Sequence, residues 1–167
     1  MGRENLIDKW RKKVNSQINT GHQSNTIEAK ILKNITPELA KIEAELFEKI
    51  NCLECANCCK TTPTVFTESD INCICKRTNM SKKFFLENMV IKDLDGTYTS
   101  LSTPCYFLEE DSSCKIYEFR PQACRSYPHV SATKNAYMWK WQAKNTRVCP
   151  ISYYLLEKIH NNLSHDL

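Results

Sequence analysis

Glycine is scarce in this sequence of 167 residues, which contains only Gly2, Gly21 and Gly96. The G-x-G-x-x-G loop of dinucleotide-binding folds and the G-x-x-x-x-G-K-[ST] loop of phosphate-binding folds therefore cannot occur. Long apolar runs are lacking too. No stretch approaches the roughly 18 apolar residues of a membrane span, and the opening segment MGRENLIDKWRKKV lacks the apolar core of a signal peptide. We therefore expect a cytoplasmic chain with no membrane partner.

The chain also has a small net charge and a low fraction of apolar side chains. Lys and Arg number 23 against 19 Asp and Glu, and this net charge of +4 is too small to favour a nucleic-acid partner. Apolar residues make up 41% of the chain, against about 45–50% in an ordinary globular domain. Ten of these residues are cysteines, so the core is thin and packing is not their only possible role.

Cysteine is what the sequence has in excess. In a reducing compartment such a set is more typical of metal binding or redox chemistry than of a disulfide framework, which an even number also fits. Cys52, Cys55, Cys58 and Cys59 form a C-x2-C-x2-C-C cluster. Two-residue spacers let a tight loop fold several sulfurs around one metal centre. Cys58 and Cys59 would point to opposite faces of an extended backbone, so they need not serve one site.

Four further cysteines lie far along the chain, at Cys105, Cys114, Cys124 and Cys149. Cys105 and Cys114 flank a predicted hairpin that would bring their sulfurs close. Because a closed zinc site or an iron–sulfur cluster usually takes four protein ligands, these eight predicted metal ligands would fill two centres. The C-x2-C-x2-C element and the Cys149-Pro150 pair favour a 4Fe-4S iron–sulfur cluster, whereas two closed zinc sites fit the same count.

Other candidate residues have a structural and a functional interpretation. Cys73 and Cys75 lie two apart on a predicted helix, and we expect both to be structural. His129 could replace a thiolate, but a capping or hydrogen-bonded histidine is the commoner case. Four cations near the cysteines either donate to sulfur or pair with neighbouring carboxylates. These cations are Lys60, Lys115, Arg120 and Arg125.

The pattern of elements predicts an α+β fold, a small metal-stapled domain with a short β-hairpin, few short helices and an N-terminal helical arm. The arm occupies residues 1–50, and residues 51–167 form the cysteine-cluster metal-binding domain with a C-terminal helix. Apolar residues at helical spacing predict helices over 3–18 and 37–50, with a break at Thr36-Pro37. The domain is expected to contain an extended stretch at 61–66, helices at 71–78 and after Ser81, a turn at Asp95-Gly96, strands at 98–101 and 136–142, a hairpin of 105–108 with 114–117, and a closing helix over about 151–161.

The cysteine pattern resembles the YkgJ-type cysteine cluster family, the zinc- or iron-chelating CxxCxxCC domain. The resemblance rests on the cluster at 52–59, on Cys105-Tyr-Phe-Leu, and on the run from Cys114 through Arg120-Pro121 to Tyr127-Pro128, and it covers about residues 50–130. It implies metal binding by the cysteines of this region, with Arg120, Pro121, Arg125 and Pro128 as framework. Flagellin lysine N-methylase is similar in carrying this type of cluster. The ligands so implied are Cys52, Cys55, Cys58, Cys59, Cys105, Cys114 and Cys124.

Three functions are compatible with these features. The leading hypothesis is a metal-binding module, with a protein partner contacted through the N-terminal helices. The alternative is a metal-dependent enzyme for methyl transfer or redox chemistry, related to flagellin lysine N-methylase, although no catalytic residue can be named and only analogy supports it. Nucleic-acid binding through the N-terminal basic helix and the Trp139-Lys140-Trp141 segment is the least favoured, because the net charge is small.

Overall fold

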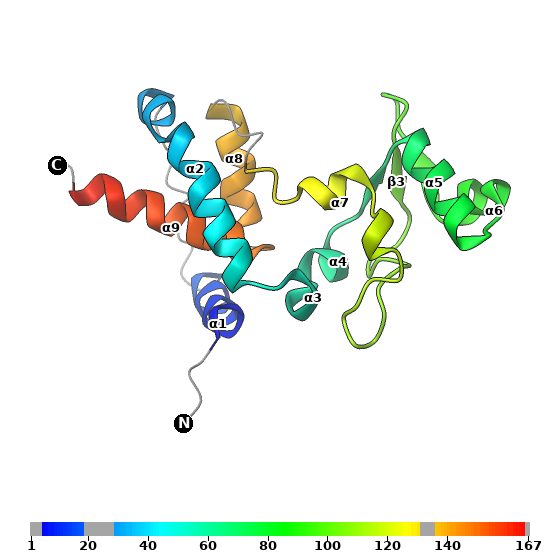
Figure 1. The fold of residues 1–167 in the computed structure, drawn as a ribbon, viewed down its shortest axis with the longest axis horizontal. Helices are drawn as coiled ribbons and strands as arrows, with labels where there is room; N and C mark the ends of the chain where they lie inside the picture. Colours follow the sequence, from blue (N-terminus) through cyan, green and yellow to red (C-terminus); the bar gives the residue numbers. More distant parts are fainter. Residues whose placement is uncertain (1–4, 19–28, 131–135, 166–167) are drawn as a thin grey trace. The chain divides into compact units, whose positions relative to one another are not determined.

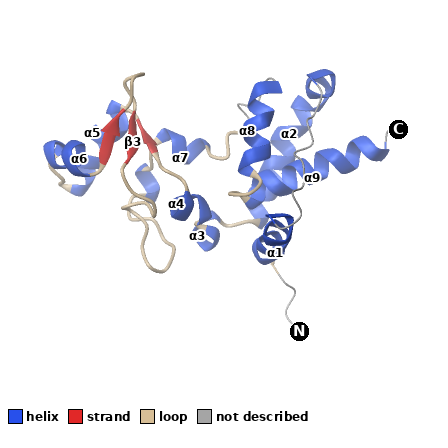
Figure 2. Ribbon diagram, turned by 180° about the vertical axis from the view of Figure 1, so that it is seen from behind, coloured by secondary structure: helices blue, strands red, loops and turns tan. Residues whose placement is uncertain are grey.

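The structure, a computed structural model, describes residues 5–18, 29–130 and 136–165. The fold combines helices with a small antiparallel sheet, as the predicted α+β class requires (Figure 1, Figure 2). None of the helices in these ranges is long and apolar enough to cross a membrane.

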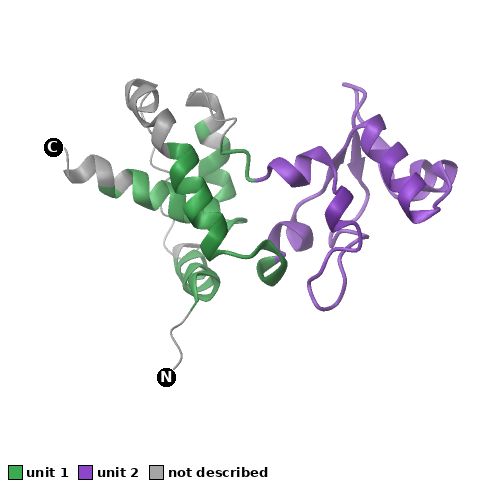
Figure 3. Ribbon diagram, in the orientation of Figure 1, with its two compact units in different colours: residues 1–55, 128–167 green, residues 56–127 purple. Residues whose placement is uncertain are grey.

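The chain forms two compact units (Figure 3). Unit 1 comprises Met1–Cys55 and Pro128–Leu167, and unit 2 comprises Ala56–Tyr127. The sequence-based division into an arm of residues 1–50 and a domain of residues 51–167 stays a prediction. The boundary between the units lies inside the C-x2-C-x2-C-C cluster, so Cys52 and Cys55 belong to unit 1, and Cys58 and Cys59 belong to unit 2.

Unit 1 is helical in its described part. Its elements are α1 (Leu6–Ile18), α2 (Ala29–Lys49), α3 (Cys52–Cys55), α8 (Ala136–Asn145) and α9 (Pro150–His165). The last of them, α9, packs against α1, α2 and α8.

The apolar faces predicted for the N-terminal helices are buried in unit 1. Trp10 and Val14 are buried on α1, and Leu39, Ile42 and Leu46 on α2. The predicted break at Thr36-Pro37 is wrong, because α2 continues from Ala29 to Lys49. Proline lacks one backbone donor, but the turns on either side keep their own hydrogen bonds and the amphipathic face continues.

The strand predicted over 136–142 is also wrong, because these residues belong to α8. Trp139 is 4% exposed and Trp141 is 50% exposed. Tyr137, Trp139 and Trp141 alternate along the chain, and residues two apart point to the same face of a strand, which is why the sequence predicted one. On a helix, residues two apart diverge by about 200°, so Trp139 is buried while Trp141 is exposed.

Unit 2 contains the sheet and several short helices. Its elements are α4 (Asn57–Thr61), β1 (Val65–Phe66), α5 (Glu68–Thr78), α6 (Lys82–Asn88), β2 (Val90–Lys92), β3 (Tyr98–Ser100), the 3-10 helix η1 (Tyr117–Phe119) and α7 (Gln122–Ser126). The strands are antiparallel in the order β1-β3-β2, with Phe66 paired to Tyr98 and Ile91 paired to Thr99. Gly96, at φ 86°, allows the turn between β2 and β3.

The predicted hairpin of 105–108 with 114–117 is reduced to one bridge, between Leu108 and Cys114. Lys115 donates its backbone N–H to Phe107 at 3.0 Å, but the chain then turns into η1, where the Tyr117 N–H bonds the Cys114 carbonyl. The pairing therefore stops after one step. A hairpin with a regular hydrogen-bond ladder is instead formed by β2 and β3, which lie on either side of the predicted Asp95-Gly96 turn.

The core of unit 2 surrounds Phe85, which is fully buried. Phe85 lies edge-on to Phe66, with ring centroids 5.4 Å apart, and is stacked with Phe107 at 6.3 Å. Ile71 and Ile74 of α5 belong to the same cluster. Cys105 and Cys114 pack against it, so the core and the cysteines are parts of one assembly.

The Asp70 carboxylate connects two helices of unit 2. One of its oxygens accepts the Thr67 N–H at 2.9 Å and the Thr67 hydroxyl at 2.7 Å, while Thr67 in turn caps α5. The other oxygen accepts the Gln122 N–H at 3.1 Å, at the start of α7. Asp70 is only 8% exposed. Removing it would leave these donors without their acceptor in a largely buried place.

We predict that Asp70→Ala lowers the free energy of unfolding by about 2 kcal/mol, from the lost cap and the unsatisfied donors. Urea unfolding followed by circular dichroism measures this change. Glu87→Ala is the control, because Glu87 lies on the surface of α6 and its distance to Lys83 is 3.9 Å. We expect that control to change stability by less than about 0.5 kcal/mol. Equal effects of the two variants would contradict the role assigned to Asp70.

Candidate metal centre

The two units divide the eight predicted ligands. Unit 2 contains five of them, and unit 1 contains the other three. The five in unit 2 are Cys58, Cys59, Cys105, Cys114 and Cys124, and the three in unit 1 are Cys52, Cys55 and Cys149. All eight are free thiols in the structure.

Helix α4 presents the first two thiols of unit 2. The helix follows Ala56, whose left-handed backbone (φ 47°) turns the chain before Asn57. Cys58 and Cys59 are both partly buried, with their Sγ atoms 4.0 Å apart. The expectation that adjacent cysteines point to opposite faces does not apply, because successive side chains on a helix diverge by only about 100°.

Two more thiols reach this region from the segment after β3. The Cys105 N–H donates to the Cys59 carbonyl at 2.8 Å, which joins that segment to α4. Cys114 lies in the bridge with Leu108. Both thiols are partly buried at the margin of the Phe85 cluster.

The fifth thiol of unit 2, Cys124, lies on α7. The Gln122 N–H at the start of this helix bonds Asp70, and the Cys124 N–H bonds the Pro121 carbonyl at 3.0 Å. Pro121 is buried and begins the turn, because its fixed φ suits a helix entry. The backbone thus fixes where the Cys124 thiol stands.

Cys59 is the most acidic thiol of this group. Its pKa is lowered to about 7, mainly by a hydrogen bond from the Cys58 thiol and further by the charges of Arg120 and Lys60, against the opposing effect of burial. A thiolate is the form that binds metal ions. Near neutral pH, Cys59 can therefore supply a ligand without a large cost of deprotonation.

Burial has the opposite effect on the neighbouring thiols. It raises the pKa of Cys105 and of Cys114, and it raises the pKa of Cys124 to about 12. The negative charge of Cys59 raises all three further. The charges of Cys105 and Cys114 also raise the pKa of Cys124, so the four thiols lie within electrostatic range of one another. A cation among them would favour the deprotonated form of all four.

Thr64 is a residue of this site that the sequence analysis missed. Its side chain hydrogen-bonds the thiols of both Cys105 and Cys124 and lowers their pKa values, against the larger effect of burial. Its backbone is held by Ser100, through bonds in both directions at 2.8 Å. The sequence showed Thr64 only as part of an extended stretch before β1, and no motif marks a hydroxyl that serves two distant cysteines.

Unit 1 brings together a smaller set of thiols. Cys52 and Cys55 lie one helical turn apart on α3, whose first N–H groups are capped by Asn51. Cys149 precedes α9, and its N–H bonds the Asn145 carbonyl at 2.7 Å. Burial raises the pKa of Cys149 to about 12, and the charges of Cys52 and Cys55 add to this effect. Cys149 therefore lies within electrostatic range of both.

The remaining candidates stand apart from these sets. Cys75 is buried in the core of unit 2, as expected, whereas Cys73 on the same helix is exposed. His129 belongs to unit 1, and burial lowers its pKa, which favours the neutral ring.

The donor chemistry of unit 2 fits a thiolate-bound metal. Cys59, Cys105, Cys114 and Cys124 supply four sulfur ligands, the number that a closed zinc site or a four-iron cluster requires. Across the described ranges, no three cysteine, histidine or carboxylate side chains are gathered tightly enough to hold a single ion as they stand.

We predict that iodoacetamide modifies Cys59 before Cys124 when metal-free protein is treated at pH 7. With a pKa of about 7, about half of Cys59 is thiolate at that pH, whereas Cys124, at about 12, remains protonated. Raising the pH to about 8 accelerates modification of Cys59 by less than a factor of about two, because about half of that thiol is already ionised at pH 7. Peptide mass spectrometry measures the order, and equal rates at pH 7 would contradict it.

The part of the chain that contains the cysteine pattern matches the model of a known protein family. Over residues 51–150 the chain matches the CxxCxxCC family model, described as "Putative zinc- or iron-chelating domain". Neither the comparison with curated proteins nor that with solved structures yields a match. The similarity to flagellin lysine N-methylase stays a prediction. Since the match covers more than half of the sequence and includes all eight predicted ligands, the chain belongs to the CxxCxxCC family of zinc- or iron-chelating domains.

Proposed function

We propose that this chain is a metal-binding module in which Cys59, Cys105, Cys114 and Cys124 hold one metal centre, with a 4Fe-4S cluster favoured over zinc. The observation that supports it is the electrostatic coupling of these four thiols in unit 2. They come from segments well separated in sequence, and the backbone bond from Cys105 to Cys59 joins two of those segments.

The sequence supports the choice of cluster. The C-x2-C-x2-C element and the Cys149-Pro150 pair are typical of iron–sulfur proteins, whereas two closed zinc sites fit the same number of thiols. When bound, such a cluster would accept and release an electron at a potential that its surroundings tune.

The other predicted ligands remain part of the proposal. Cys58, with its Sγ atom 4.0 Å from that of Cys59, is a fifth thiol in unit 2 and stabilises the Cys59 thiolate. Cys52, Cys55 and Cys149 form a second candidate set in unit 1. Three thiols leave one ligand position open on a four-coordinate centre.

The setting of the module is part of the same proposal. Ten free thiols suit a reducing compartment such as the cytoplasm. The apolar faces of α1 and α2 are buried in unit 1. A protein partner reached through these helices would therefore contact their polar faces. The exposed side chains of α1 include Lys9, Arg11 and Lys12.

Metal analysis of protein purified without oxygen tests the proposal. We expect a brown protein that contains iron and sulfide in similar amounts. Cys124→Ser and Cys105→Ser should each lose most of this iron from unit 2, whereas Cys73→Ser, a control at an exposed cysteine of the same unit, should retain it. Colourless protein with bound zinc would overturn the choice of cluster. Unchanged metal content in Cys124→Ser and Cys105→Ser would overturn the ligand set.

We also predict that metal removal destabilises unit 2. The metal links segments that otherwise depend on a few hydrogen bonds and one apolar cluster, and metal-binding free energy adds to folding free energy. Treatment with a chelator should lower the melting temperature and increase hydrogen exchange in α4 and α7. The Cys124→Ser variant is the control, because chelator should change its unit 2 much less. Equal protection of α4 and α7 with and without metal would contradict this prediction.

A further inference from the structure

The four cations near the cysteines have different partners in the structure. Lys115 pairs with the Glu109 carboxylate at 3.1 Å, as ordinary surface pairing predicts. Arg125 is exposed and donates to the Gln122 side-chain oxygen at 2.9 Å. Lys60 acts on Cys59, but its ammonium group is exposed and donates to the Ser112 hydroxyl at 2.9 Å.

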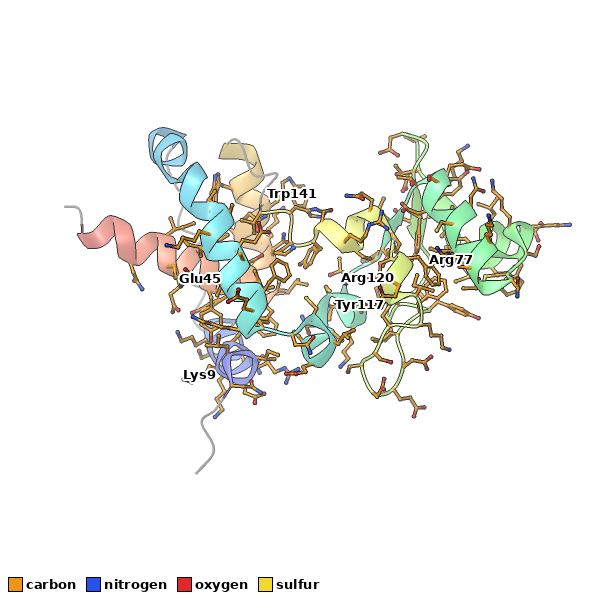
Figure 4. The ribbon with its side chains drawn as sticks, in the orientation of Figure 1. Lys9, Glu45, Arg77, Tyr117, Arg120 and Trp141 are labelled. Carbon is orange, nitrogen blue, oxygen red and sulfur yellow. The ribbon has the colours of Figure 1, made fainter. Side chains whose placement is uncertain are left out.

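Arg120 differs from the other three in how it is held. Its guanidinium carbon lies 3.6 Å from the centroid of the Tyr117 ring, and its Nε donates to the Tyr117 carbonyl at 2.9 Å. Figure 4 shows the two side chains together in the part of unit 2 that precedes α7. The Arg120 carbonyl also accepts a hydrogen bond from Arg125. Both the side chain and the backbone carbonyl of Arg120 are therefore held by neighbouring residues.

Arg120 lies between two of the proposed ligands, because the N–H of its stacking partner Tyr117 bonds the Cys114 carbonyl at 3.1 Å and the carbonyl of the next residue, Pro121, accepts the Cys124 N–H at 3.0 Å. Within the described part of the chain, its guanidinium makes no ion pair with a carboxylate. It acts on Cys59 and also on Cys114, two thiols of the proposed centre. A partly buried cation with no carboxylate partner is less screened than one on an exposed side chain. Four thiolates around zinc or around an oxidised four-iron cluster leave a net charge near −2, which such a cation would offset.

We propose that Arg120, held by the Tyr117 ring, is a positioning residue that sets the affinity and the reduction potential of the metal centre in unit 2. This inference rests on the proposed function, because it requires metal at Cys59, Cys105, Cys114 and Cys124. Arg120 makes no bond to the metal. It stabilises the ligand charge from outside the thiolate shell, and the stacking on Tyr117 fixes where that charge stands.

Two substitutions at this position separate charge from placement. Arg120→Gln removes the charge, and Arg120→Lys keeps it without the planar group that stacks on the ring. Arg77→Gln is the matched control. Arg77 is an exposed arginine of unit 2 whose guanidinium carbon lies 5.8 Å from the Phe119 ring centroid. Arg77 is not among the largest causes of the pKa shifts of the four proposed ligands. The control therefore makes the same change in net charge away from the main charges that act on the thiols.

Loaded protein is titrated with a competing chelator, and the reduction potential is measured where iron is present. We expect Arg120→Gln to weaken metal retention about tenfold, the lower end of the usual effect of an outer-shell partner, and to make the potential more negative. Arg120→Lys should recover part of both changes, and Arg77→Gln should match the unchanged protein. Circular dichroism of the metal-free variants checks that each is folded.

The outcomes distinguish the two proposals. If the unchanged protein binds no metal, the proposed function fails and the role of Arg120 fails with it. If metal binds but Arg120→Gln retains it as well as Arg77→Gln does, with the same potential, the proposed function stands and the role of Arg120 is overturned. An equal loss in Arg120→Lys and Arg120→Gln would also overturn it, because charge would then not be the cause.

Discussion

The backbone hydrogen bond from Cys105 to the Cys59 carbonyl is the contact on which the candidate centre most depends. It joins the cysteine-dense helix α4 to a segment that the chain reaches only after α5, α6 and the sheet. The elements between them bury Phe85 and its neighbours, and this burial provides the driving force for closing so long a loop. The thiols are therefore brought together by the hydrophobic core, which in turn is extended by Cys105 and Cys114 at its margin.

The pKa values of the thiols limit the negative charge of the site before any metal is present. Only Cys59 has a pKa near neutrality, while burial keeps the protons on Cys105, Cys114 and Cys124. Near neutral pH the metal-free protein thus carries at most one negative charge among these four thiols rather than four, which avoids a costly cluster of buried thiolates. A cation that reaches Cys59 first would favour deprotonation of the other three in turn.

Much of this arrangement could be predicted from the sequence. The helices around Trp10 and Leu46, the cap at Ser81 and the turn at Asp95-Gly96 follow from local patterns, and the structure contains all of them. The errors occurred where local patterns were ambiguous. The alternating aromatic residues Tyr137, Trp139 and Trp141 have the period of a strand although the segment is helical, and the ladder at Leu108 and Cys114 ends after one bridge because the chain turns into η1.

The candidate site could be predicted only in part, for a related reason. The spacing of the cysteines identified them as metal ligands, but spacing does not say which distant thiols share a centre. That depends on tertiary packing, which places the boundary between the units just after Cys55 and puts five of the eight in unit 2. The side chains of Thr64 and Arg120 also act on these thiols. Arg120 could be named from its place among the cysteines, but the Thr64 hydroxyl carries no spacing signal that would mark it for this purpose.

Unit 1 is built from two segments that flank unit 2 in the sequence, and this has a consequence for the order in which the protein is made. Unit 2 is one continuous segment, so it can fold while the ribosome is still adding residues. The helices α1 and α2 are synthesised before unit 2, but α9, which packs against both, is synthesised after it. Until α9 is synthesised, the apolar faces of α1 and α2 stay exposed, and Cys52 and Cys55 lack the third thiol of their set, Cys149. A nascent chain can therefore complete the thiol set of unit 2 before that of unit 1.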